Sequence, residues 1–129
     1  MNTAVAEPIT AASLPAIGAA FSGGIFAGIT LHEDKLYALV LLSEDGEPME
    51  WPDALEFAAK RDGVLPSRID MIVLYKNLPV QFKKAWYWTS EEHPANADFA
   101  FVQGFGNGSQ SSGHKGNGYR ARAVRRVAL

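Results

Sequence analysis

The spacing of apolar residues changes twice along this chain, and these changes restrict the fold more than any other feature of the sequence. Residues 25–30 and the nearly all-apolar run 35–42 are typical of strands, and the second is predicted to be buried and central. Residues 54–59 and 67–78 follow a helical period, and from residue 86 onward the period is two. This order predicts an α+β fold, with a twisted antiparallel sheet and two flanking helices.

Capping and turn residues mark the ends of the two helical segments. Asp53 is expected to cap the first helix, and Gly63 to end it. Ser67 is expected to cap the second helix, with the acidic Asp70 three residues later. Both helices are therefore predicted to be short.

The C-terminal third is predicted to contain three strands and one long loop. Strands are expected around residues 86–89 and 99–105 and over the closing segment 119–129. Between the last two lies a glycine-rich stretch, residues 104–118, which is predicted to be a solvent-exposed loop.

The composition excludes several classes of protein. The chain has 129 residues, enough for one domain with a real core, and 47% of them are apolar. It has no cysteine, which excludes disulfides, cysteine zinc sites and thiol nucleophiles. The formal net charge is −2, whereas nucleic-acid binders are basic. No apolar run approaches the roughly 20 residues of a membrane span. We therefore expect neither a nucleic-acid partner nor a membrane span.

The segment 1–21 is predicted to be an N-terminal arm that precedes a folded domain of residues 22–129. Glu7 is the one charge before residue 31, and no Lys or Arg precedes Lys35. A secretion signal would begin with positive charge, so none is expected. The arm is expected to be extended or to become ordered on a partner, and the alternative is a loose leader. The candidate assembly contacts in the arm are Val5, Ile9, Leu14 and Ile17.

Three ordered pieces of the sequence resemble a known family. They are Leu65-Pro66-Ser67-Arg68 with the following 74–78, then residues 86–91 (WYWTSE), then residues 119–126 (YRARAVRR). Their order and residue types resemble the C-type-lectin-like domain named for the C-terminal part of a bacterial collagen-like adhesin, many members of which are short proteins of tailed phages and prophages. The phage form typically begins with a G-x-F-A-G strand, as at residues 24–28, and ends with R-A-V-R-R.

The resemblance implies a C-type-lectin-like fold for residues 22–129 and ligand binding through loops near the sheet. It also implies that two aromatic side chains of the triplet 86–88 pack in the core. Because Trp86 and Trp88 share one strand face, Tyr87 is the better contact candidate.

The glycine-rich stretch is the main candidate for recognition. Residues 108–115 nearly spell a phosphate-binding P-loop, but Lys115 is one place late and no Ser or Thr follows it. A recognition loop is therefore preferred, with a plain connector as the alternative. The candidate ligand- or partner-binding residues are Tyr87, Asn107, Ser109, Gln110, Ser111, His114, Lys115 and Asn117.

Four arginines, Arg120, Arg122, Arg125 and Arg126, lie close together near the C-terminus. On one strand, three of them would share a face and Arg125 would lie on the other. Ion pairs with the acid-rich residues 31–70 are expected, and the alternative is a site for phosphate, sulfate or acidic sugars.

The sequence carries no recognisable signature of catalysis or of metal binding. The sequence has no G-x-S-x-G and no H-E-x-x-H motif, and its three histidines lack zinc-type spacing. Glu91, Glu92, Asn96 and Asp98 could supply oxygen ligands for calcium, but no fixed spacing supports such a site. An enzyme acting on glycans would need paired carboxylates, and the adjacent Glu91 and Glu92 face opposite sides of a strand. We expect no enzymatic activity, no metal and no cofactor.

The resulting hypothesis is a phage or prophage binding module, a virion-associated structural or adhesion protein. It would present residues 90–98 and 104–118 to a virion component, a host protein or a surface glycan, with a homo-oligomer as a further option. Fold analogy alone supports the virion location. The alternative is a phage-encoded intracellular inhibitor of a host defence complex, which would be located in the host cytoplasm.

Overall fold

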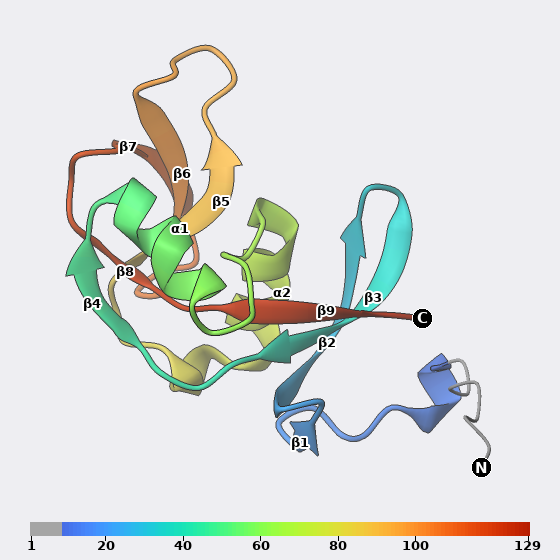
Figure 1. Cartoon of the computed structure of the whole chain (residues 1–129). Coiled ribbons are helices and arrows are strands. Elements are labelled where there is room, and N and C mark those ends of the chain that lie inside the picture. The colour runs from blue at the N-terminus through green and yellow to red at the C-terminus, as the bar shows by residue number, and fades with distance from the viewer. Residues whose placement is uncertain (1–8) are drawn as a thin grey trace.

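A computed structural model of the chain describes residues 9–129 and arranges their strands in two sheets (Figure 1). The first sheet contains, in spatial order, β1 (Ala20–Phe21), β2 (Gly24–His32), β3 (Lys35–Leu41) and β9 (Val124–Ala128). The second contains β4 (Gly46–Met49), β8 (Tyr119–Ala121), β5 (Trp86–Glu92), β6 (Phe99–Gly104) and β7 (Gln110–His114). Neighbouring strands are antiparallel except β5 and β8. The α+β class with mainly antiparallel pairing is thus confirmed, although the sequence indicated one sheet.

The prediction of one closing strand over residues 119–129 is wrong, because the chain changes sheets at Arg122 and Ala123. Arg122 is 5% exposed, and its guanidinium donates to the carbonyls of Gln81 and Leu42. The Leu42 N–H donates to the Ala123 carbonyl at 3.0 Å. These bonds fix a break between β8 and β9, so the four arginines do not lie along one continuous strand.

The first helix, α1 (Trp51–Ala59), begins earlier than the sequence predicts. Glu50 occupies the cap position and Asp53 lies in the first turn, so the prediction of Asp53 as the cap is wrong. The Trp51 N–H donates to the Lys115 carbonyl at 3.0 Å, which satisfies one of the free amides at the helix start. The turn after β7 therefore helps to position α1.

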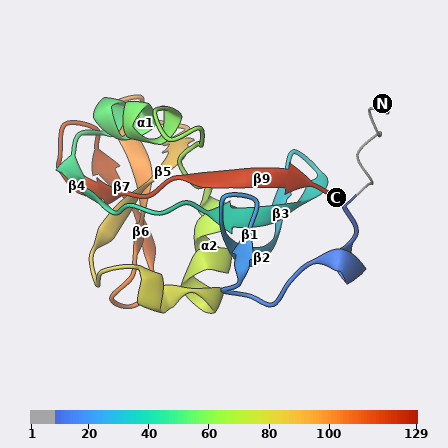
Figure 2. The same cartoon turned by 60° about the horizontal axis from the view of Figure 1, so that its bottom comes forward.

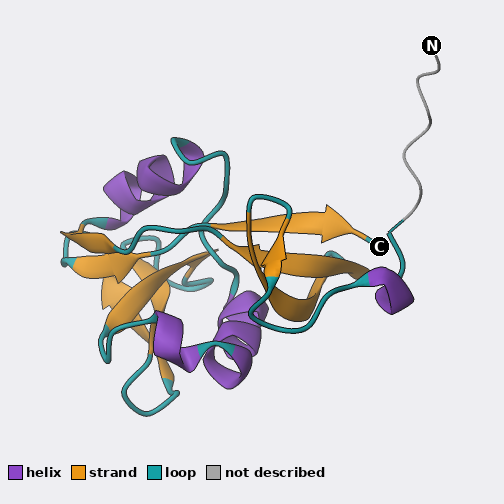
Figure 3. Ribbon diagram, turned by 90° about the horizontal axis from the view of Figure 1, so that it is seen from below, coloured by secondary structure: helices purple, strands orange, loops and turns teal. Residues whose placement is uncertain are grey.

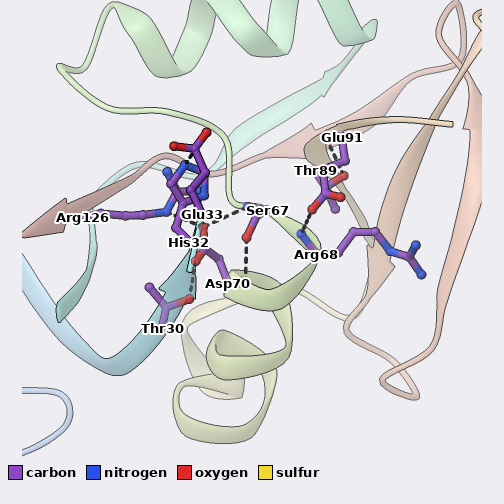
Figure 4. A network of polar contacts seen from close by, with 9 residues as sticks. All are labelled: Thr30, His32, Glu33, Ser67, Arg68, Asp70, Thr89, Glu91 and Arg126. Carbon is purple, nitrogen blue, oxygen red and sulfur yellow. Dashed lines mark hydrogen bonds and ion pairs between the residues drawn. The ribbon is translucent and has the colours of Figure 1, made fainter. Parts of the chain in front are cut away.

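The second helix, α2 (Arg68–Asn77), begins as predicted. The Asp70 N–H donates to Ser67 Oγ at 3.0 Å, and the Ser67 N–H donates to Asp70 Oδ2 at 2.9 Å. The same carboxylate accepts from Thr30 Oγ1 on β2 and from Nε and Nη2 of Arg126 on β9 (Figure 4). Asp70 thus joins the start of α2 to β2 and β9, the two strands that pair with β3 in the first sheet.

The two helices lie on opposite sides of the second sheet (Figure 3). One apolar cluster packs α1 against Trp88 and the small side chains of β6 and β8. The other packs α2, together with Leu78 and Phe82 on either side of the 3-10 helix η2 (Pro79–Gln81), against Tyr87, Phe105 and the inner face of the first sheet. Both faces of β5 are therefore buried at its centre.

The N-terminal segment is joined to the first sheet at its end. Gly18 N–H donates to the Phe26 carbonyl, Phe26 N–H donates to the Ala19 carbonyl, and the half-buried ring of Phe21 lies 5.8 Å from that of Phe26. The preceding 3-10 helix η1 (Ala11–Ser13) lies beside the C-terminal end of β9 (Figure 2). No helix within residues 9–129 is long and apolar enough to cross a membrane.

The predicted assembly contacts fall in different surroundings. Leu14 and Ile17 help to line a shallow hollow of about 330 Å³ against β2 and the end of α2. Leu14 is half-buried and Ile17 is 49% exposed. Ile9 is half-buried, and Val5 lies outside the described residues.

Candidate functional site

The glycine-rich stretch over residues 104–118 is not one loop, and this prediction is wrong. Residues 110–114 form β7, which pairs with β6 along its whole length, from Gln103 opposite Gln110 to Phe99 opposite His114. Small polar side chains and a glycine gave no signal of a strand, because pairing to β6 rather than intrinsic propensity forms it. Short turns remain on either side of β7.

Close packing, rather than flexibility, explains two of the glycines in this stretch. Gly108 has φ +81°, and a Cβ there would lie 2.6 Å from the ring of Tyr75. A Cβ on Gly113 would lie 2.5 Å from the ring of Tyr119. Aromatic side chains therefore occupy the space beside the backbone, and the stretch belongs to the packed domain.

The structure separates the eight predicted contact residues. Asn107 and Ser109 lie in the turn before β7, whereas His114, Lys115 and Asn117 lie at its other end, roughly 16 Å away for a five-residue strand. Gln110 and Ser111 are neighbours on β7 and face opposite sides of the sheet. The eight residues do not form one contact surface.

Tyr87 cannot serve as a contact, so that prediction is wrong. Its side chain is fully buried, its hydroxyl donates to Asp45 Oδ2 at 2.6 Å, and it accepts from the Lys83 N–H at 3.0 Å. Burial and the bond to the carboxylate raise the pKa of Tyr87 to about 12, so the phenol stays protonated. Trp86, expected in the core, is instead 36% exposed, because both faces of β5 are covered only further along the strand.

A different set of side chains gathers where β6 and β7 extend past α2. They are half-buried or exposed and come from α2, the loop after β5, β6 and β7: Arg68, His93, Phe99, Phe101, Gln110 and His114. We call this surface the hairpin face. It includes two of the predicted contact residues, Gln110 and His114.

Aromatic contacts order the rings of the hairpin face. Phe99 and His114 are opposite each other on β6 and β7, and their rings meet edge to face at 5.6 Å. The ring of His93 stacks on Phe101 at 5.4 Å. Each phenylalanine thus has one imidazole beside it, and the four rings form a partly exposed row.

Local turns fix which nitrogen of each imidazole carries the proton. The Ala95 N–H donates to His93 Nδ1 at 3.1 Å, and the Gly116 N–H donates to His114 Nδ1 at 2.9 Å. A nitrogen that accepts a hydrogen bond is unprotonated, so the neutral ring carries its hydrogen on Nε2. Neither Nε2 has a partner among residues 9–129, and the hairpin face therefore offers two imidazole donors.

Arg68 is held at the inner end of the row. Its Nε donates to Gln110 Oε1 at 2.9 Å, and Gln110 Nε2 donates back to the Arg68 carbonyl at 2.9 Å. The guanidinium carbon lies 3.9 Å from the centre of the Phe101 ring, a cation–π contact. The Arg68 N–H donates to Glu91 Oε2 at 2.7 Å, and Figure 4 shows the side chain directed away from the Asp70 network. Within the described chain, Nη1 and Nη2 have no partner, so they too are available donors.

The two segments expected to present a partner-binding surface do meet. The Lys115 N–H donates to the Asp98 carbonyl at 2.8 Å, and Lys115 Nζ lies 2.9 Å from Glu92 Oε2. Lys115 Nζ also lies 4.6 Å from the centre of the Trp51 ring. Lys115 therefore joins the loop after β5 to the turn after β7, and its role is structural.

The C-terminal arginines mostly make internal contacts. Arg120 approaches Asp45 and Glu47 at 3.4 and 3.6 Å, and Arg126 approaches Asp70 at 2.6 Å, which confirms the expected pairing with the acidic middle of the chain. Arg122 and Arg125 donate instead to backbone carbonyls. Their charges are thus used within the fold.

Of the hairpin face, the sequence did not indicate Arg68, Phe99 or Phe101 as contacts, and it included His93 only as part of the segment 90–98. The alternation of phenylalanines in β6 indicated that they share one face. Nothing in the sequence indicated that α2 leaves this face partly uncovered. Within residues 9–129, no three His, Cys, Asp or Glu side chains gather as a metal site would require. No protein-family model matches the chain, and no curated protein sequence matches it.

Proposed function

We propose that this chain is a non-enzymatic binding module of a phage or prophage virion, built on a C-type-lectin-like scaffold, and that the hairpin face binds a protein partner. The three motifs that resemble the family fall on α2, on β5 and on β8 with β9. They belong to the framework that supports the hairpin face. The arm, with Ile17 49% exposed, is assigned to attachment within the particle.

The observation that carries the proposal is the combination of half-exposed rings with unused donors. Phe99 and Phe101 supply apolar area, and His93, His114 and Arg68 supply N–H groups that have no acceptor among the described residues. Aromatic residues and arginine are enriched where proteins bind one another. A partner that presents carbonyl and carboxylate oxygens would satisfy these N–H groups.

Rigidity favours the same role. Each donor is oriented by a second bond, through Nδ1 of the imidazoles and through Nε of the guanidinium. A surface whose side chains are already ordered loses less conformational entropy on binding. The hairpin face is therefore prepared for a partner before contact.

Mass spectrometry of purified phage particles tests the location. We expect this chain in fixed stoichiometric copies in the particle. Absence from the particle would contradict the proposal and would favour the alternative, an intracellular inhibitor of host defence.

Adsorption to host cells tests the surface. The double variant His93→Ala/His114→Ala should be incorporated normally but should lower adsorption at least tenfold, which is about 1.4 kcal/mol. His32→Ala is the matched control, because His32 is also partly exposed but lies at the end of β2, in the other sheet. Mild protease treatment of the cells should abolish the difference. Equal adsorption of the double variant and the control would refute the assignment of the hairpin face.

A further inference from the structure

The chain contains two Asn-Gly sequences, Asn107-Gly108 and Asn117-Gly118, one on each side of β7. In such a sequence the main-chain nitrogen of glycine can attack Cγ of the asparagine side chain, because glycine has no Cβ to hinder the approach. The reaction requires that the attacking nitrogen and the side-chain amide both be free to approach each other. The two sites differ in this respect.

Three hydrogen bonds restrain the Asn107-Gly108 sequence, two of them to the Asn107 side chain. The Gly108 N–H, which would have to attack, donates to the Gly104 carbonyl at 3.1 Å. Asn107 Oδ1 accepts from Ser109 N–H at 3.1 Å and from Ser109 Oγ at 2.6 Å. The packing of Gly108 against Tyr75 restricts the turn further. Attack would require this turn to open.

Asn117 has none of these restraints. Asn117 and Gly118 are both exposed, and Gly118 N–H has no acceptor among residues 9–129. The side chain makes one contact within the described chain, from Nδ2 to the Tyr119 hydroxyl at 3.4 Å, which is long for a hydrogen bond. The main-chain bond from Asn117 N–H to the His114 carbonyl at 2.8 Å keeps the turn in place without restraining either reacting group.

The two Asp-Gly sequences, which could form the same ring, are also restrained. The Gly63 N–H after Asp62 donates to the Ala58 carbonyl at 3.0 Å. The carboxylate of Asp45, before Gly46, accepts from Tyr87 and lies against Arg120. Asn117 is thus set apart by its structure and not by its sequence.

We propose that Asn117 is a site of spontaneous deamidation. The Gly118 nitrogen forms a bond to Asn117 Cγ and loses its proton to solvent, and Nδ2 leaves as ammonia, which gives a five-membered succinimide. Water then adds to one of the two ring carbonyls and breaks its bond to nitrogen, which leaves aspartate or isoaspartate. No oxidant or reductant takes part.

The product changes the turn that joins β7 to β8. One negative charge is added two residues from Lys115, the residue that pairs with Glu92 and whose carbonyl accepts from the start of α1. Isoaspartate also inserts a methylene group into the main chain at this turn. The change therefore falls beside the hairpin face, directly after Gly116, which orients His114.

Peptide mapping by mass spectrometry of the full chain, aged in mildly alkaline buffer, tests the proposal. We expect Asn117 to be lost at least tenfold faster than Asn107, a difference of about 1.4 kcal/mol in barrier. In denaturant the two rates should converge, because both sites then have the same Asn-Gly chemistry. Equal rates in the folded protein, or a faster reaction at Asn107, would overturn the proposal.

Two variants test the physical reasons. Gly118→Ala should slow the loss of Asn117, and it should fold, because a Cβ there meets its nearest atom at an ordinary 3.5 Å. Ser109→Ala removes one bond to Asn107 Oδ1 and should speed the loss of Asn107 without changing that of Asn117. An unchanged rate at Asn107 in Ser109→Ala would show that its hydrogen bonds do not protect Asn107, and an unchanged rate at Asn117 in Gly118→Ala would contradict attack by the Gly118 nitrogen.

Discussion

Removing the Asp70 carboxylate should destabilise the domain more than any other single change of an acidic residue. Asp70 is fully buried, and its Oδ2 accepts three hydrogen bonds, from Ser67 N–H and from Nε and Nη2 of Arg126. Its Oδ1 accepts from the Thr30 hydroxyl at 2.5 Å. Asp70→Ala leaves the Arg126 guanidinium without a counter-charge, although the Arg126 side chain is only 13% exposed. Breaking such a pair costs about 3–5 kcal/mol.

Asp70→Asn separates the charge from the geometry. An amide oxygen in the place of Oδ2 still accepts all three bonds, and the amide NH2 in the place of Oδ1 can donate to Thr30, whose hydroxyl also accepts. What is lost is the charge assistance on the bonds from Arg126, about 1–3 kcal/mol. The expected order of stability is wild type, then Asp70→Asn, then Asp70→Ala.

Urea unfolding followed by tryptophan fluorescence measures these differences as shifts of the midpoint at constant slope. Asp53→Asn is the control, because Asp53 lies exposed in the first turn of α1 and should change stability by about 0.5 kcal/mol or less. An Asp70→Ala variant as stable as Asp53→Asn would refute the reasoning. If Asp70→Ala does not fold, the Asp70→Asn midpoint still decides whether the charge matters.

Three further measurements probe the packing and the buried polar groups. Gly113→Ala should lower the free energy of unfolding by about 1–3 kcal/mol, because its Cβ would lie 2.5 Å from an aromatic ring. Gly106→Ala meets nothing within 4 Å and should change it by about 0.5 kcal/mol or less. Equal thermal midpoints of the two variants would contradict this. The pKa of the Tyr87 phenol is raised from an ordinary 10 to about 12, so the protonated phenol stabilises the fold below pH 10. The domain should lose about 2–3 kcal/mol of this stability between pH 10 and 12. Alkaline unfolding curves should show this loss, and Tyr87→Phe should lack it. Arg122→Ala should cost about 2–4 kcal/mol and Lys115→Ala about 1 kcal/mol, because the first leaves the carbonyl of the buried Leu42 and that of Gln81 without a donor and the second removes a surface pair; equal denaturant midpoints would refute the difference.

The parts of the fold that the sequence predicted depend on local signals. Ser67 and Asp70 satisfy each other's backbone amides within one turn, so their spacing alone was enough to locate the start of α2. The apolar run of β3 indicated a central strand, and β3 does lie between β2 and β9 in the first sheet. The cap of α1 was misplaced because its first amide is satisfied from Lys115, more than sixty residues away in the chain.

The parts that it missed depend on distant contacts. The break between β8 and β9 follows from the hydrogen bonds of Arg122 to carbonyls in two other segments. The alternation of residues 119–129 does not indicate these bonds. The same applies to β7. A segment reading Gln-Ser-Ser-Gly-His has little strand propensity, and it is a strand because β6 offers a free edge and because Gly113 gives room to Tyr119. Replacing residues 107–117 by a flexible linker would remove this strand rather than a passive loop.

The hairpin face shows why a binding surface of this kind escapes sequence analysis. His93 follows β5 and His114 ends β7, and each acts as a donor because a turn amide two residues later occupies its Nδ1. Phe99 and Phe101 stay half-exposed because α2 begins only at Arg68, which bonds to Gln110. Each of these causes is local. The side chains of the hairpin face come together, however, only through the register of three strands and the position of one helix. A shift of β7 by one residue against β6 would turn His114 and Gln110 to the other face. The proposed function therefore depends on the same strand pairing that the composition of β7 concealed.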